Sequence, residues 1–363
     1  MLEDRHLQAG PPEKRGRGQA PDAPTGDRHP SDRSRHHGSS RRRFLADQRT
    51  ARCQHGARAG KSDPRLSPGE KTRRACAGVD RHSRHEGHGR HSDTRDRRGG
   101  YHTRYWEAGD PAAAPVVLLH DGAWGADGYV TWSDVMADLA ADHHVLAPDL
   151  LGFGGTDKVV YFDRPPYPFR ITHVGAFCRA VGLTRPAHFV GTSFGGSMVL
   201  RACHGTDWEM ASVTSIGGTG GPWRLELGKQ VLTELQPGRE YIERVVELLT
   251  NDVTGFEDNV DRRLANSLLP GHYGAMVSLR LQHPQAPPVT RVDDYPATLA
   301  SARCPVTVVE MSEDRLMEAG WTAHVKATAP QVDVVHMAGP HCPNLTAPAK
   351  TADLLRRIFA RAA

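Results

Sequence analysis

The sequence predicts an α/β protein in which a mostly parallel, doubly wound sheet carries a helical lid and follows a disordered basic tail. From about residue 101 onward, short apolar runs alternate with helical patterns, as in parallel sheets covered by helices on both faces. A long stretch at about residues 217–302 has helical patterns and no clear strand. Residues 1–100 differ from both in composition.

The first hundred residues are strongly basic and poor in apolar side chains. They hold 24 Lys and Arg against 13 Asp and Glu, a net charge of +11, and Phe44 is their one aromatic residue. Residues 101–363 hold 22 basic and 29 acidic residues, a net charge of −7. Because such a tail cannot bury enough apolar surface to offset its ordering entropy, we predict that residues 1–100 are disordered.

Two functional interpretations of the tail are disfavoured. Nucleic-acid binding would use its Lys and Arg density, but stacking aromatics and an organising motif are missing. Metal binding would use the histidines that recur every three residues, but no cysteine stands beside them at zinc-ligand spacing. These histidines are His82, His85, His88 and His91. An inert tail and a misassigned start in G+C-rich coding DNA remain open.

The chain shows neither an apolar N-terminal signal region nor an apolar run of 18 residues, which predicts no secretory signal and no membrane span. Its six cysteines are dispersed, without the spacing of a metal site or a disulfide framework. We therefore expect a cytoplasmic protein. The sequence implies no metal or organic cofactor.

The core is predicted over 101–216 and 303–363, with the lid at 217–302 between its two parts. Buried strands of parallel sheets are continuous apolar runs, whereas an exposed edge strand alternates. On these patterns strands are expected at 101–108, 116–120, 144–148, 189–190, 213–216, 306–310 and 332–337. Helices are expected near 132–139, 171–181, 197–202, 321–327 and 351–360, and within the lid at 241–249 and 259–268.

The most informative motif is Gly191-Thr192-Ser193-Phe194-Gly195, between an apolar run and a helical pattern. A serine on a sharp strand-to-helix turn needs small residues two positions to either side, because bulk there would clash with the crossing strand and helix. Such a turn exposes the hydroxyl above the sheet edge. We therefore identify Ser193 as the candidate nucleophile.

A serine nucleophile needs a base, and the base needs an acid that orients it. Asp314 and His341 each lie in a loop that follows one of the last two predicted strands. Because parallel strands end at the same sheet edge, we expect both side chains to lie near Ser193. The competing residues Glu310, Glu313 and His336 are assigned to a strand or to a solvated position.

An oxyanion formed on attack needs two backbone N–H donors. The amide of Phe194, directly after the nucleophile, is one candidate. The loop after His120 supplies the other, for which we choose Gly122 with Ala123 as the alternative. His120 itself is interpreted as a support for this loop.

Because of these motifs, residues 101–363 resemble the α/β-hydrolase superfamily. Within it they look most like the meta-cleavage product hydrolases. That resemblance implies cleavage of a carbon–carbon bond in a 2-hydroxy-6-oxo-dienoate from aromatic degradation. The segment that begins at Arg263 is similar to the arginine-bearing lid helix of that family, which implies that Arg263 binds near the dienoate end. We call the loop that follows His120 and contains Gly122 the oxyanion loop. We also expect Trp124, in this loop, to contact substrate.

The chain departs from the family pattern at three places. Asp121 stands where glycine is usual, Cys342 where tryptophan is usual, and Met311 replaces a glycine before the acid. A carboxylesterase or lactonase acting on an apolar ester, and a non-catalytic ligand-binding module, remain alternatives. The expected partner is a small-molecule substrate and not a membrane, and a homo-oligomer is left open.

Overall fold

The fold was analysed in a computed structural model of the 363-residue chain. It describes residues 90–95 and 100–362, apart from 162–163, 235, 237, 279–280, 282–284 and 286–292. For residues 90–95 it describes the backbone alone.

One sheet of eight strands organises the described part of the chain, in the spatial order β1-β2-β4-β3-β5-β6-β7-β8. The pairs β1–β2 and β2–β4 are antiparallel, and the remaining pairs are parallel. The strands are β1 (Arg90–Arg95), β2 (His102–Ala108), β3 (Ala114–Leu119), β4 (His143–Pro148), β5 (Ala187–Thr192), β6 (Met210–Ile216), β7 (Val306–Met311) and β8 (Asp333–Met337). The predicted mostly parallel sheet is thus confirmed.

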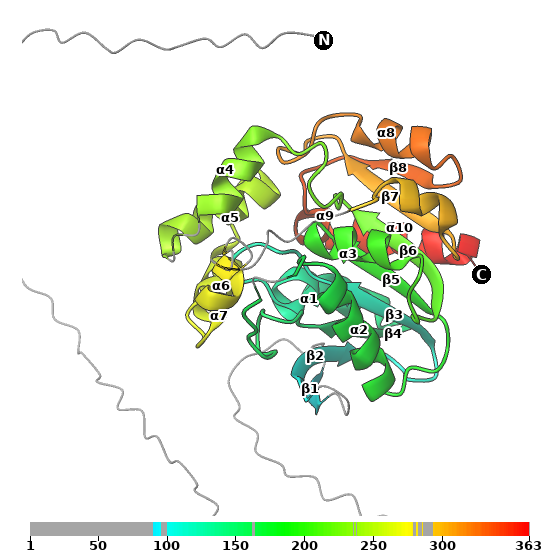
Figure 1. Ribbon diagram of the computed structural model, residues 1–363, viewed down its shortest axis with the longest axis horizontal. Helices are drawn as coiled ribbons and strands as arrows, with labels where there is room; N and C mark the ends of the chain where they lie inside the picture. Colours follow the sequence, from blue (N-terminus) through cyan, green and yellow to red (C-terminus); the bar gives the residue numbers. More distant parts are fainter. Residues whose placement is uncertain are drawn as a thin grey trace, which may run out of the picture. The chain divides into compact units, whose positions relative to one another are not determined.

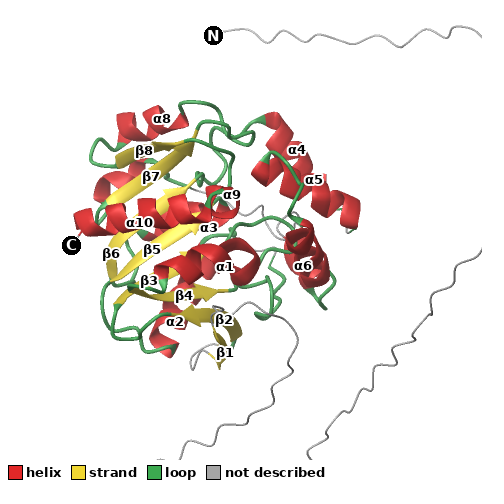
Figure 2. Cartoon of the chain, turned by 180° about the vertical axis from the view of Figure 1, so that it is seen from behind, coloured by secondary structure: helices red, strands yellow, loops and turns green. Residues whose placement is uncertain are grey.

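Helices cover both faces of this sheet (Figure 1). They are α1 (Gly128–Leu139), α2 (Pro168–Ala180), α3 (Phe194–Ala202), α8 (Trp321–Thr328), α9 (Pro343–Thr346) and α10 (Pro348–Ala362). Helices α1 and α10 lie across one face (Figure 2), and α2 and α3 pack on the other. This arrangement is the predicted doubly wound layering.

Strand β3 shows why its sequence is an unbroken apolar run. Val116 and Leu118 pack into the core beneath α1 and α10, whereas Val117 and Leu119 pack into the core beneath α2 and α3. All four side chains are fully buried. A strand buried on both faces cannot alternate apolar with polar residues, and its apolar burial contributes most of its stabilisation.

The segment between β6 and β7 is helical and lies beyond the carboxyl ends of the parallel strands (Figure 1). We refer to its helices α4–α7 as the helical insertion; its role as a lid remains a prediction. The helices are α4 (Glu226–Glu234), α5 (Arg239–Thr250), α6 (Glu257–Ser267) and α7 (His272–Val277), followed by the 3-10 helix η2 (Ala297–Ser301).

One expectation about the tail was wrong. Residues 90–95 form strand β1, whose backbone pairs with β2 from Arg90 opposite Glu107 to Arg95 opposite His102. A polar segment can occupy a sheet edge because main-chain hydrogen bonds, rather than apolar burial, hold it there. The other calls on residues 1–99, including the histidine run apart from His91, lie outside the described residues.

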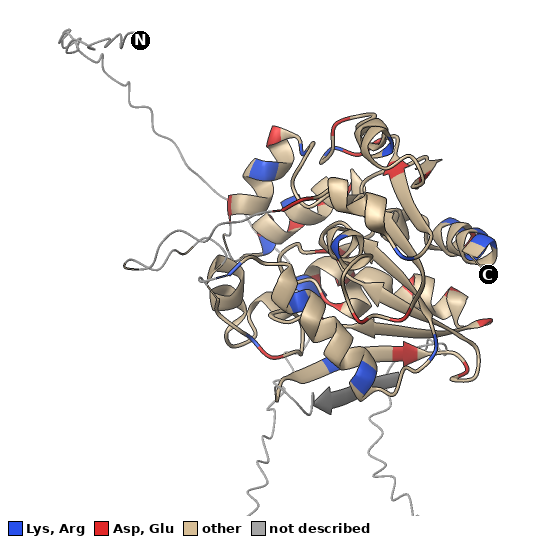
Figure 3. Cartoon of the chain, turned by 45° about the vertical axis from the view of Figure 1, so that its right-hand side comes forward, with Lys and Arg blue, Asp and Glu red and all other residues tan. Residues whose placement is uncertain are grey.

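Lys, Arg, Asp and Glu residues are spread over the helices, strands and loops of the folded part in the view of Figure 3. Over the residues that the structure describes, no helix is both long and apolar enough to cross a membrane. Within the same residues, no group of three or more His, Cys, Asp and Glu side chains is placed to hold a metal ion.

Candidate active site

Ser193 occupies the turn between β5 and α3. Its backbone has φ 51° and ψ −110°, a conformation that a non-glycine residue adopts only under local constraint. Its amide donates to the carbonyl oxygen of Ile216 at 2.8 Å, which fixes the turn to β6. A Cβ atom on Gly191 would collide with the backbone of Gly195, and one on Gly195 would lie 2.6 Å from the carbonyl carbon of Leu119. The two glycines are therefore required by contact with neighbouring backbone.

His341 and Asp314 meet at the same sheet edge. The Nδ1 atom of His341 lies 2.7 Å from Oδ2 of Asp314, and both side chains are almost fully buried. The other carboxylate oxygen of Asp314 accepts from the amide of Leu316 at 2.8 Å. Among the described residues, the Nε2 atom of His341 has no hydrogen-bond partner. The ring therefore has one nitrogen held by an acid and the other available to a reacting group.

Two glycines after β6 bring His341 and the turn at Ser193 together. A Cβ atom on Gly217 would lie 2.9 Å from Cε1 of His341, and one on Gly218 would lie 2.5 Å from the carbonyl oxygen of Ser193. This glycine run was not among the site residues predicted from the sequence. Its position directly after a central strand was the signal that it borders the site.

The two chosen oxyanion donors are neighbours. A Cβ atom on Gly122 would lie 2.6 Å from Cβ of Phe194, so the two backbones approach closely. The amides of Phe194 and Gly122 form no hydrogen bond with any residue the structure describes. The amide of Ala123, the alternative donor, already donates to Oδ1 of Asp121 at 2.9 Å. This geometry favours Gly122 over Ala123.

His120 supports the oxyanion loop from below. Its Nε2 atom accepts from the amide of Leu150 at 2.9 Å, so Nδ1 carries the proton and donates to the carbonyl oxygen of Asp121 at 2.6 Å. Complete burial lowers the pKa of His120, which keeps the ring neutral. Its own carbonyl oxygen accepts from the amide of Gly195 at 3.1 Å. The loop and the turn at Ser193 are thereby linked.

Arg263 forms an ion pair with Asp121, with its Nη2 atom 2.8 Å from Oδ2. Both side chains are buried. Burial by itself would raise the pKa of Asp121, but the Arg263 guanidinium overcomes this and lowers it to about 2. The charge of Asp121 beside the oxyanion loop is thus compensated within the protein.

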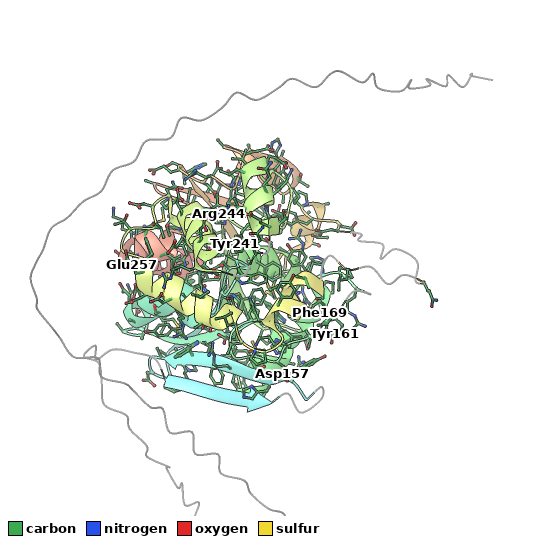
Figure 4. All side chains as sticks on the ribbon, turned by 90° about the vertical axis from the view of Figure 1, so that its left-hand side faces the viewer. Asp157, Tyr161, Phe169, Tyr241, Arg244 and Glu257 are labelled. Carbon is green, nitrogen blue, oxygen red and sulfur yellow. The ribbon has the colours of Figure 1, made fainter. Side chains whose placement is uncertain are left out.

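Trp124 belongs to an aromatic group between the oxyanion loop and the helical insertion. Its ring meets those of His272, Tyr273 and Tyr241 edge-on, with centroids 5.2, 5.9 and 6.4 Å away. Figure 4 labels Tyr241 on α5. Burial lowers the pKa of His272 to about 4, so this ring is neutral near pH 7. Trp124 is buried within this aromatic group. Its contact with substrate, expected from the sequence, stays a prediction.

Cys342 takes the position after His341, where the resemblance makes a tryptophan usual. Its Sγ atom lies 3.9 Å from Oγ1 of Thr192, the residue before Ser193. Burial raises the pKa of the thiol, so it is protonated near pH 7. Cys342 is therefore a small buried residue that follows His341 in the chain and contacts Thr192.

A cavity of about 590 Å³ in the described part of the chain lies near the start of α2 and the end of α3, and its lining contains none of Ser193, Asp314 and His341. The Arg201 guanidinium lies at its wall between the rings of Tyr167 and Tyr295, 4.4 and 4.6 Å from their centroids. This cavity is therefore separate from the three side chains at the sheet edge.

A family model described as "Alpha/beta hydrolase family" matches residues 116–354. A 2-hydroxy-6-oxo-6-(2'-aminophenyl)hexa-2,4-dienoic acid hydrolase of Metapseudomonas resinovorans is 34% identical over 180 residues, which cover 47% of this chain and 56% of that protein. A 2-hydroxy-6-oxo-2,4-heptadienoate hydrolase of Pseudomonas putida is 26% identical over 184 residues, covering 50% of this chain and 64% of that protein.

The chain therefore spans between about half and two thirds of the length of these two curated relatives. Among solved structures, a serine hydrolase involved in carbazole degradation superposes with a TM-score of 0.63 at 22% identity. The match covers 76% of this chain and all of that one. At this level of identity the likeness concerns the fold.

Proposed function

This chain belongs to the alpha/beta hydrolase family, and from that premise we propose that it is a serine hydrolase with Ser193, His341 and Asp314 as its catalytic triad. The observation that carries the proposal is the His341–Asp314 hydrogen bond of 2.7 Å beside the constrained turn at Ser193. An acid on Nδ1 and a free Nε2 are what a general base needs in order to activate a hydroxyl.

In the proposed mechanism, His341 takes the proton of Ser193 as Oγ bonds to a substrate carbonyl carbon. Asp314 stabilises the imidazolium that forms, and the amides of Phe194 and Gly122 hold the oxyanion. His341 then gives its proton to the leaving group as that bond breaks. Water attacks the acyl carbon with His341 as base, which releases the acid and restores Ser193.

For the substrate we propose a 2-hydroxy-6-oxo-dienoate, in which the bond broken joins the carbonyl carbon to a carbon leaving group. The names of the two curated relatives describe substrates of this class. Transfer of the 2-hydroxyl proton to the carbon beside the ketone first gives a keto tautomer. The unsaturated 2-oxo acid of this tautomer accepts the electrons of the breaking bond, which makes a carbon leaving group accessible to the same triad. Cytoplasmic location stays part of this proposal.

The second candidate is an ester with an uncharged acyl group. One observation favours it: Arg263, the residue expected at the dienoate end, is already paired with Asp121. A neutral apolar ester would need no cation at that position. The same triad and oxyanion donors would perform its hydrolysis.

Both candidates are tested by assaying the full chain against a 2-hydroxy-6-oxo-dienoate and p-nitrophenyl butyrate. Ser193→Ala should lower the rate by at least about 10³-fold, since it removes the nucleophile. Ser301→Ala, at an exposed serine, is the matched control and should match the wild type. Loss of dienoate absorbance that requires Ser193 supports carbon–carbon cleavage. Release of p-nitrophenol without any loss of dienoate absorbance supports the ester. An inactive wild type would favour the ligand-binding module.

A further inference from the structure

The carboxylate of Asp121 is fully engaged by protein groups from three parts of the chain. Oδ1 accepts from Nη1 of Arg263 at 3.2 Å and from the amide of Ala123 at 2.9 Å. Oδ2 accepts from Nη2 of Arg263 at 2.8 Å and from the hydroxyl of Thr131 at 2.9 Å. Thr131 lies on α1 and Arg263 on α6, so Asp121 joins both helices to the oxyanion loop.

Arg263 is equally committed. Its Nε atom donates to Oδ1 of Asn259, one turn earlier on α6, at 2.9 Å. Each of its three guanidinium nitrogens therefore has a protein acceptor, and the residue is completely buried. A side chain in this state has no surface to offer a substrate unless the pair first breaks.

Further contacts press α6 and α7 against the same loop. Asn266 donates to the carbonyl oxygen of Gly125 at 3.0 Å, and the amide of Gly125 donates to Nε2 of His272 at 3.3 Å. A Cβ atom on Gly125 would collide with the carbonyl group of Arg263. The backbone from Asp121 to Gly125 is thus held from the insertion side, and Gly122 lies within it.

We propose that Arg263 is a positioning residue, which acts through Asp121 to hold the Gly122 amide where the oxyanion forms. This rests on the proposed function of Ser193, Phe194 and Gly122 as nucleophile and oxyanion donors. The bidentate pair fixes the residue before Gly122 in both distance and orientation. Without Arg263, the carboxylate of Asp121 would be a buried and uncompensated charge, and the loop would move to hydrate or protonate it.

The test compares Arg263→Met with Arg262→Met in the full chain. Arg262 is the neighbouring arginine on α6; it pairs with Asp127, which keeps Arg104 as a second partner. Arg263→Met should slow phosphonylation of Ser193 by a fluorophosphonate by about 10²-fold, the size of effect seen when an oxyanion donor is lost. Arg262→Met should stay within about twofold of the wild type, because its loss leaves no unpaired charge.

A pair of esters separates positioning from substrate contact. We use p-nitrophenyl pentanoate and p-nitrophenyl hydrogen glutarate, which differ in a terminal methyl or carboxylate. Arg263→Met should lower kcat equally on both and change KM by no more than about twofold, because the loss lies in the transition state. A rise in KM confined to the glutarate would assign Arg263 to the substrate and overturn the proposal.

Three further variants keep the result interpretable if Arg263→Met is poorly folded. Asp121→Asn keeps the shape of the side chain but removes its charge. The double variant Asp121→Asn with Arg263→Met should lose no more activity than Arg263→Met alone, because the two residues act as one unit. Arg263→Lys should recover part of kcat. Fully additive losses would overturn the proposal. A wild type that a fluorophosphonate does not label at Ser193 would instead remove the proposed function itself.

Discussion

Glycine positions around His341 control the room available to the imidazole. Gly217 has φ 61°, and a Cβ atom there would lie 2.9 Å from Cε1 and 3.1 Å from Nδ1 of His341. The ring is held in turn by Asp314 and cannot retreat without losing that bond. A methyl group at Gly217 would therefore clash with the imidazole of His341, the proposed base.

We predict that Gly217→Ala lowers kcat by at least about 10-fold, because a displaced base transfers protons less efficiently. Gly255→Ala is the matched control: its φ is 82°, and no atom lies within 4 Å of its Cβ position. Both variants should lose about 1 kcal/mol of unfolding free energy from the left-handed backbone. Kinetic assays and thermal unfolding distinguish the two effects. Equal kcat losses would contradict the steric explanation.

The partner of Arg263 shows what sequence reasoning could not reach at this scale. Ser193, Asp314 and His341 were selected because each follows a predicted strand, and strand ends of a parallel sheet converge. Asp121 and Arg263 are 142 residues apart and meet only through the packing of α6 on the oxyanion loop. No local pattern reports such a contact. Asp121 was noticed as an unusual residue, but its compensation was not.

Asp121 also gives a pH prediction. Its pKa is about 2 in the folded chain, below the ordinary value of 3.8, so the unfolded chain binds its proton first as the pH falls. The stabilisation is fully present above about pH 4 and is lost towards pH 2, about 2 kcal/mol in all. Asp121→Asn should lack this component. Urea unfolding of both chains between pH 2 and 5 measures it, and parallel curves would refute it.

At the scale of elements, the end of α5 reaches the loop that carries Asp314. The helix is capped by Asn251 in the left-handed conformation, φ 66°, and the Asn251 side-chain amide donates to the carbonyl oxygen of Glu313 at 2.9 Å. The amide of Cys342 donates to the carbonyl oxygen of Leu249 at 3.0 Å. One helix end of the insertion thus contacts the loops of both the proposed acid and base.

Replacing Asn251 separates backbone conformation from side-chain bonding. Asn251→Ala should lower the unfolding free energy by about 1 kcal/mol more than Asn251→Gly, because alanine is strained in the left-handed region where glycine is not. Both lose the hydrogen bond to Glu313. Thermal unfolding of the two variants and the wild type provides the comparison. Equal destabilisation would show that the hydrogen bond, not the cap, is what matters.

Elements were predictable where burial dictates the residues. The apolar runs predicted at 306–310 and 144–148 are strands β7 and β4 with ends shifted by a residue. Helix α5 was expected at 241–249 from its apolar periodicity and spans Arg239–Thr250. Strand β1 was missed, because its sequence RHSDTR carries no apolar alternation. Main-chain pairing along a neighbour's edge leaves little trace in side-chain pattern.

At the scale of the whole molecule, the candidate site draws on one sheet edge and on the insertion. Its described contacts all lie between Leu119 and Cys342. Residues 1–89 contribute 20 basic and 11 acidic residues, a net charge of +9 in a chain of net +4. The remaining chain is therefore acidic, with a net charge of −5. The site and the basic charge belong to different parts of the sequence.

Two truncations test this separation. A chain that begins at Arg90 keeps β1 and should retain kcat/KM within about twofold. It should lose any salt-sensitive retention on immobilised DNA, because that retention depends on Lys and Arg density.

A chain that begins at Asp96 lacks β1 and leaves β2 as the exposed edge. Its thermal midpoint should fall by about 2–4 °C for each kcal/mol of pairing lost, with kcat/KM at 25 °C again unchanged. Loss of activity in the chain beginning at Arg90 would place part of the site in the tail, and an unshifted midpoint for the chain beginning at Asp96 would mean that β1 adds nothing to the sheet.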